Sequence, residues 1–221
     1  MAEGDAISSA PSANDLLAPD RLAGAPAEVM RRFDAAVRDA YWQQKSLRLS
    51  LNLAHAGIAY GLGKAGEAPS AEQCRELLGT VKTLAYNAAS FAWPGWDEPG
   101  IAIGPRELAE AAGAAALNLR LAEELRRPAD KVADAHWLVG ATHLALRRFS
   151  GAAAAFERAS DLRDGDLEHG YVLLARLCSR DALAKRAWDE LIARLADGDA
   201  ASADLRSQLV TAHRVFLKPV G

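Results

Sequence analysis

One glycine-rich segment of this chain has residue types that could hold a phosphate. The segment Gly61–Gly66 satisfies the pattern G-x-G-x-x-G, in which glycines let the backbone approach a pyrophosphate closely. That chemistry requires a strand before the glycines and a helix directly after them, whereas here a helical pattern precedes them and Glu67-Ala-Pro69 follows. Lys64 is followed by Ala65, where a phosphate loop needs serine or threonine. We therefore predict that the segment ends a helix, and we expect no cofactor.

The histidines and acidic residues lack the spacing of a metal or catalytic site. His136 and His143 lie seven residues apart, so they share a helix face about two turns from each other, too far for one metal without a third element. The acidic turn Asp161–Glu168 misses the spacing of a calcium-binding loop. No Ser/His/Asp or Cys/His arrangement is visible, although five histidines and many acids leave convergence of distant residues open. We predict no metal site and no catalytic residue, and expect the two cysteines to be small hydrophobic residues.

A loop rich in tryptophan is harder to explain as a mere connection. The segment Trp93-Pro-Gly-Trp-Asp-Glu-Pro-Gly100 holds two prolines and two glycines, which exclude a helix. Trp93 and Trp96 would expose a large amphipathic area unless they folded back onto the helices. Folding back is the favoured reading. A contact of both tryptophans with a binding partner is the alternative, because aromatic anchors are enriched in interfaces.

The composition narrows the class of protein. Of the 221 residues, half are hydrophobic but only 6% are aromatic, and the abundance of alanine and leucine favours closely packed helices. A net charge of -3 gives no bulk field for a polyanion, so nucleic acid is not expected as a partner. The least polar window, residues 49–63, contains Ser50, Asn52 and His55 and falls short of a membrane span. The N-terminus lacks the basic and apolar regions of a signal peptide, so a cytoplasmic location is expected.

Helical periodicity covers the chain after a non-periodic beginning. Residues 1–25 are predicted to form a flexible tail, and residues 26–217 a single α-helical domain. Residues 27–44 and 47–62 carry helical patterns, either as two helices broken near Ser46 or as one long helix. Ser70 has the spacing of a helix cap, and Pro105 suits a first helical position. In all, nine helices and no sheet are expected.

Other short motifs predict how the later helices begin, end and pack. Ser150 is expected to cap a helix, and small residues at Ala109, Gly113 and Ala116 are expected to admit a neighbouring helix. Two Asp-Gly-Asp turns, at residues 164–166 and 197–199, follow each other at a separation of 33 residues. We expect their glycines to be left-handed and each following aspartate to cap the next helix. Their separation is typical of a repeated helix pair.

The segment from His136 to Ala159 resembles the tetratricopeptide repeat, a helix–turn–helix unit. It places small residues and one large aromatic where the family pattern has them: Gly140, Ala152, Phe156 and Ala159. The next pair resembles the pattern more loosely, with Ala184 and Trp188 in the places of Ala152 and Phe156. Departures are His136 where the family has tryptophan, His143 where it has tyrosine and Asp164 where it has proline. The resemblance implies an all-α fold of antiparallel helix pairs stacked as a short right-handed solenoid with a C-terminal capping helix.

Such repeats imply a protein-interaction module. The expected partner is a peptide or a helix of another protein, bound in the groove lined by the first helix of each pair. By resemblance, the groove-facing positions would be Asp134, Trp137, Leu144, His169 and Arg176. The alternative is a small-molecule-binding or catalytic helical domain with a pocket beneath the Trp93–Gly100 loop. Homo-oligomerisation through an apolar end or through the alanine-rich helix from Pro105 is a further possibility.

Overall fold

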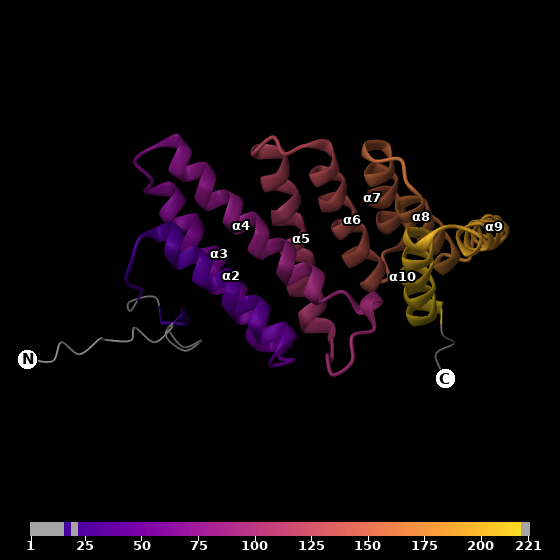
Figure 1. The fold of residues 1–221 in the computed structure, drawn as a ribbon, viewed down its shortest axis with the longest axis horizontal. Helices are drawn as coiled ribbons and strands as arrows, with labels where there is room; N and C mark the ends of the chain where they lie inside the picture. The colour runs from indigo at the N-terminus through magenta and orange to yellow at the C-terminus, as the bar shows by residue number, and fades with distance from the viewer. Residues whose placement is uncertain (1–15, 19–21, 218–221) are drawn as a thin grey trace, which may run out of the picture.

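The computed structural model describes residues 16–18 and 22–217, and every regular element in them is helical (Figure 1). The predicted all-α class is confirmed. Most of the predicted tail lies outside the described residues, but Leu16 is buried and Leu22 packs against the core. The elements are α2 (Pro26–Trp42), α3 (Leu47–Gly66), α4 (Ala71–Phe91), the 3-10 turn η2 (Pro94–Trp96), α5 (Pro105–Glu124), α6 (Ala129–Ala145), α7 (Phe149–Leu162), α8 (Asp166–Cys178), α9 (Ala184–Ala196) and α10 (Ala200–Leu217).

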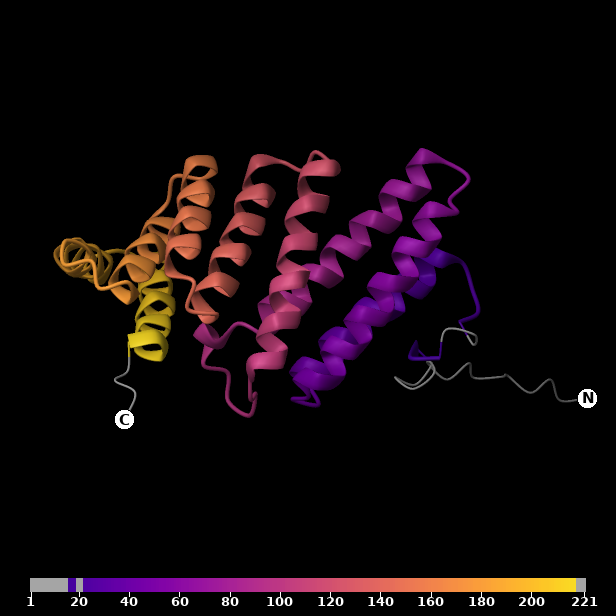
Figure 2. The same cartoon turned by 180° about the vertical axis from the view of Figure 1, so that it is seen from behind.

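The helices follow one another as a row in which each packs against the next (Figures 1 and 2). Second neighbours also touch, since α4 contacts α2 and α6 while α3 contacts α5. The last helix breaks this order. It turns back onto α8 and α9 and reaches η2, the turn between α4 and α5, so that the C-terminal helix covers a loop from the middle of the chain. None of the described helices is long and apolar enough to cross a membrane.

Two helix starts are set by serine hydroxyls. Ser46 separates α2 from α3, and its hydroxyl accepts a hydrogen bond from the Leu49 N–H at 3.4 Å. The choice between two helices and one long helix is therefore settled in favour of two. Ser70 begins α4, and its hydroxyl accepts from the Gln73 N–H at 3.2 Å as its spacing predicts.

The expected turn chemistry was wrong at Ser150 and at both glycines of the Asp-Gly-Asp turns. Ser150 lies inside α7, which begins at Phe149 after the residue Arg148. Gly165 is extended, with φ -159°, and itself precedes α8, so it does not end the previous helix in a left-handed conformation. In the second Asp-Gly-Asp turn, Gly198 is not left-handed either. Its capping prediction is confirmed, because the Asp199 carboxylate accepts from the Ser202 N–H at 3.0 Å and caps α10.

Four of the turns between consecutive helices have a left-handed basic residue where glycine would be expected. Positive φ angles of 48° to 65° occur at four such positions, which are Lys45, Arg126, Arg147 and Arg180. A left-handed L-residue with a Cβ costs about 1–2 kcal/mol, which glycine would avoid. The preference for glycine past a helix end therefore fails as a guide to these turns.

The crossing of α6 and α7 is as close as the spacing predicts. A Cβ atom added at Gly140 would lie 2.6 Å from Cδ1 of Phe156, and Ala152 and Ala159 are fully buried in the same crossing. In contrast, the small residues Ala109 and Gly113 of α5 face solvent, and a Cβ at Gly113 would meet nothing within 4 Å. The expectation that this stripe receives another helix of the chain is therefore wrong. The buried face of α5 consists of Ala111, Ala114, Ala115, Asn118, Leu121 and Ala122.

Candidate functional site

The Trp93–Gly100 loop is held in a defined shape by its own backbone. The N–H of Trp93 donates to the Ser90 carbonyl at 3.1 Å as α4 ends, and the N–H of Asp97 donates to the Pro94 carbonyl at 3.0 Å. Asp97 and Gly100 have positive φ angles of 51° and 81°, which turn the chain back twice. Both tryptophan rings of the loop lie about 6 Å from the Trp137 ring, at 6.0 Å for Trp93 and 5.9 Å for Trp96.

Trp93 belongs to a packed cluster, which we define as Trp93, Trp137, Phe156, Tyr171 and Phe216. The Trp93 side chain is 1% exposed, stacks on Phe216 at a centroid distance of 4.9 Å and meets Trp137 edge-on at 6.0 Å. Trp137 meets Tyr171 at 5.1 Å, and Tyr171 meets Phe156 at 5.2 Å. One loop and four helices thus share a single aromatic core. The favoured reading of Trp93, folding back onto the helices, describes its position.

The residues predicted to face a groove do not share one surface. Trp137 belongs to the packed cluster at 5% exposure, and Leu144 is fully buried. Asp134 is partly buried and pairs with Arg163 at 2.7 Å. His169 and Arg176 are exposed, and Arg176 pairs with Glu157 at 2.7 Å. Trp137 is covered by the chain's own loop, since its ring lies 6.0 Å from that of Trp93 and 5.9 Å from that of Trp96.

The loop also meets a second group of aromatic residues. We define this pocket cluster as Tyr41, Trp42, Phe91 and Trp96. Tyr41 and Phe91 are stacked at a centroid distance of 4.0 Å, and Trp42 meets both rings edge-on. Trp96 is fixed by its indole N–H, which donates to the Ser90 carbonyl at 2.8 Å. All four line an open cavity of about 320 Å³, which falls at the small end of the range for ligand sites.

Glu98 supplies the charge of this cavity, and Lys45 lies at its edge. Glu98 lines the cavity together with the pocket cluster and Ser90. The Lys45 ammonium donates to Glu98 Oε1 at 2.7 Å and lies 5.5 Å from the centroid of the Trp42 ring. Burial, with a smaller contribution from the Glu98 charge, raises the pKa of the Tyr41 phenol to about 12. The cavity therefore combines neutral aromatic walls with one carboxylate.

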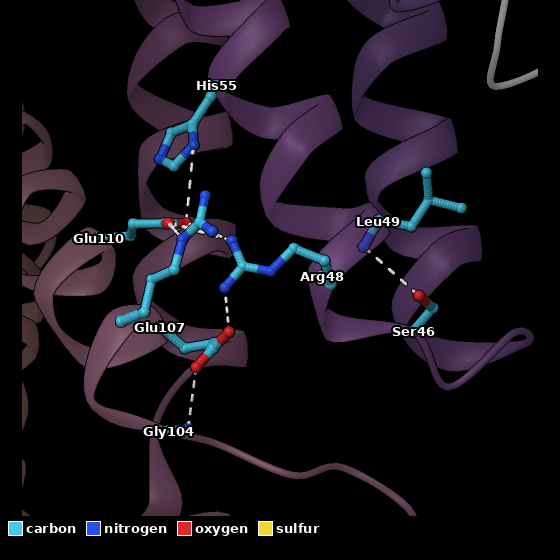
Figure 3. Close-up of polar contacts among 8 residues, drawn as sticks. Ser46, Arg48, Leu49, His55, Gly104, Glu107 and Glu110 are labelled. Carbon is cyan, nitrogen blue, oxygen red and sulfur yellow. Dashed lines mark hydrogen bonds and ion pairs between the residues drawn. The ribbon is translucent and has the colours of Figure 1, made fainter.

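A separate polar network joins α3 to the start of α5 (Figure 3). The Arg48 guanidinium donates to Glu107 and, at 3.0 Å, to Glu110. The hydrogen bond from Arg48 leads the causes that lower the pKa of the Glu107 carboxyl. Partial burial opposes ionisation of Glu110, but hydrogen bonds from Arg106 and Arg48 outweigh it and lower that pKa as well. Both carboxylates are thus ionised partners of arginine, which suits a clamp between helices and not a general acid.

Residues 16–18 and 22–217 contain no cluster of three or more potential metal ligands. Cys74 and Cys178 are free thiols, and burial raises the pKa of Cys178 to about 11, which disfavours the reactive thiolate.

The sequence indicates the loop as a candidate site but does not identify most of the residues that line the cavity. Trp96 was singled out, whereas Tyr41, Trp42, Phe91 and Glu98 were not. The sequence offers one signal, the adjacent aromatic residues Tyr41 and Trp42 at the end of α2. Tyr41 belongs to the buried stripe of that helix and Trp42 does not, so the Trp42 ring is available to line a surface cavity. The pairing of Lys45 with Glu98 spans 53 residues of sequence and has no local signature.

No family model matches this sequence. No curated protein and no solved structure matches it either.

Proposed function

We propose that this chain is a ligand-binding helical protein whose ligand enters the cavity beneath the Trp93–Gly100 loop. The carrying observation is that four aromatic side chains and one carboxylate, from α2, α4 and the loop, converge on one open cavity. A few polar groups set in apolar walls are what small-molecule sites use for orientation and affinity. This is the alternative to the peptide groove, and it concerns binding without assigning a reaction.

We further propose that the fold is a short tetratricopeptide-like solenoid. The successive packing of helices, the second-neighbour contacts of α4 with α2 and α6, and the close Gly140–Phe156 crossing support it. The return of α10 onto α8 fits the expected capping helix. In this arrangement α10 and the tryptophan loop fill part of the inner face and leave the cavity at its border.

The binding proposal is tested by a fragment screen observed through the tryptophan indole N–H signals in NMR. Fragments that enter the cavity should shift the Trp42 and Trp96 signals, and Trp42→Ala should abolish the shift of Trp96. Leu183→Ala is the matched control. Leu183 is the apolar residue just before α9, is 84% exposed and does not line the cavity. A chemically diverse library that moves neither indole signal at millimolar concentration would exclude this site.

A peptide partner is a second candidate, favoured by a shallow groove of about 530 Å³ along α4 and the α5–α6 turn. Charged side chains of both signs line it, among them Glu72, Arg75, Glu76 and Arg127. We propose that a peptide of mixed charge lies in this groove. Selection from a displayed peptide library tests it, with loss of binding expected for Arg127→Ala and no change for the exposed control Arg206→Ala. Binders that are indifferent to Arg127 would reject this groove.

A further inference from the structure

The Lys45 ammonium lies between two groups that both favour a cation. One is the face of the Trp42 indole, 5.5 Å away, and the other is Glu98 Oε1, 2.7 Å away. Both residues also line the cavity, whereas Lys45 reaches them from the turn between α2 and α3. The chain's own side chain therefore marks a place at the cavity edge where a positive charge is stabilised.

We propose that the ligand of this cavity is a compact ammonium group, and that Lys45 is an internal competitor which the ligand displaces. The inference rests on the proposed ligand site and names the chemistry that the site selects. Aromatic faces attract cations through the ring quadrupole, most strongly at tryptophan, and cages of such rings bind quaternary ammonium groups. A methylated ammonium suits these walls best, because it loses little hydration when it is enclosed.

Four aromatic side chains line the cavity that would take such a group, and Trp42, at 48% exposure, is far more open than Tyr41 at 1% and Phe91 at 8%. Tyr41 and Phe91 form one stacked wall, Trp42 stands edge-on to them, and the Trp96 ring is fixed by its hydrogen bond to Ser90. Glu98 closes the set with a carboxylate that is only 25% exposed. A carboxylate at this place repels phosphate and carboxylate ligands, so the same geometry that favours ammonium excludes anions.

Lys45 competes as a tethered ligand. Because it is part of the chain, its effective concentration at the cavity edge is on the order of millimolar or higher. A free ammonium must displace it from both Trp42 and Glu98. Removal of the Lys45 charge should therefore strengthen ligand binding, whereas removal of Glu98 or Trp42 should weaken it. A residue of merely structural importance would not produce opposite effects at the two ends of one ion pair.

The test measures the binding of choline by isothermal titration calorimetry, with its neutral isostere 3,3-dimethyl-1-butanol in parallel. Choline should bind at least about tenfold more tightly than the isostere, since only the charge differs. Glu98→Gln and Trp42→Ala should each weaken choline binding about tenfold or more. Lys45→Met keeps the aliphatic stem and the left-handed turn but removes the charge, and should tighten binding severalfold. Leu183→Ala should change nothing.

Two further arms locate the source of the ammonium and separate this inference from the proposed site. Trimethyllysine, free and within a short peptide, is compared with choline; tighter binding of the peptide assigns the ammonium to a protein side chain. Equal binding of choline and its isostere, with Glu98→Gln unchanged, would overturn the ammonium inference while the ligand site stands. Binding of fragments in the cavity without binding of choline would likewise overturn the ammonium inference and leave the ligand site standing. If neither choline nor any fragment shifts the Trp42 indole, both proposals fail together.

Discussion

The Trp93–Gly100 loop contacts two groups of aromatic side chains that differ in how far they are enclosed. The packed cluster, around Trp93, is closed by helices, because α10 brings Phe216 over the ring and α8 brings Tyr171 against it. The pocket cluster, around Trp42, is buried at Tyr41 and Phe91 but leaves Trp42 48% exposed. Ring-to-ring stacking occurs in both groups. What distinguishes them is the exposed Trp42 ring beside Glu98, which lines the same cavity. The two groups meet, because Trp93 and Tyr41 line one small cavity of about 210 Å³ together with Glu98 and Val215 of α10.

This difference separates structural aromatic residues from binding ones. In the packed cluster every ring contacts another ring or a helix, so removal of one ring leaves a void in the core. In the pocket cluster the rings already border an open cavity, so removal of Trp42 would enlarge a space that solvent reaches. The comparison therefore predicts that stability depends on the first cluster, and ligand affinity on the second.

The largest expected effect is that of Trp93→Ala. The change removes a side chain that is 1% exposed from the centre of the packed cluster, and such truncations cost about 3–5 kcal/mol of unfolding free energy. Urea denaturation followed by circular dichroism measures this loss. A cost below about 1 kcal/mol would show that the cluster collapses around the gap, and that the two clusters are alike.

High pH should destabilise the protein through one buried tyrosine from each cluster. Burial raises the pKa of Tyr41 and of Tyr171 to about 12, whereas an unfolded tyrosine ionises near 10. The folded state holds these protons more tightly, so their contribution is complete below about pH 10 and is lost as the pH rises through 12. Two pKa units correspond to roughly 2–3 kcal/mol for the enclosed Tyr171, and to less for Tyr41, because solvent in the open cavity screens its phenol.

Urea midpoints between pH 8 and pH 11.5 measure this decline. Tyr41→Phe and Tyr171→Phe should each make it shallower, and the double variant shallower still. If only Tyr171→Phe had an effect, Tyr41 would be as well solvated as an unfolded tyrosine, and the pocket cluster more open than its geometry indicates.

Gly140→Ala should cost about 1–3 kcal/mol by overpacking the helix crossing behind the packed cluster. The added Cβ would lie 2.6 Å from the Phe156 ring, which is itself in contact with Tyr171. Gly113→Ala is the matched control, since its Cβ would enter open space on the exposed face of a helix. Alanine also has the higher helix propensity, so the control should be neutral or slightly stabilising. Equal thermal shifts in the two variants would contradict a tight crossing.

Most of the helical fold could be predicted because it depends on local signals. The recurrence of Val29, Phe33 and Val37 marks the buried stripe of α2, and the hydroxyl of Ser70 marks the start of α4. The left-handed turns could not be predicted in this way. Lys45 and Arg126 tolerate a conformation that glycine would adopt more easily, because contacts between the flanking helices fix the chain direction there.

The candidate site was predictable only as a location. Two tryptophans in a proline- and glycine-rich loop are conspicuous in sequence, but nothing local distinguishes Trp93, which is buried, from Trp96, which lines the cavity. Their different environments depend on α10, which returns from the far end of the chain. The meeting of Tyr41 with Phe91 and Glu98 likewise depends on how α2 packs against α4, and sequence periodicity does not specify such contacts.

The smallest expected effect on stability, Trp42→Ala, tests the comparison most directly. Trp42 ends α2 and is 48% exposed, so its removal should lower the unfolding free energy by about 1 kcal/mol or less. The Trp42 ring meets Tyr41 and Phe91 edge-on, but those two rings stay stacked on each other without it. Urea denaturation of Trp42→Ala beside Trp93→Ala gives the ratio of the two effects, expected to be at least about three. A ratio near one would mean that Trp42 belongs to the core. The selective loss of affinity expected for Trp42→Ala would then reflect a weakened fold, and no longer the removal of a wall of the cavity.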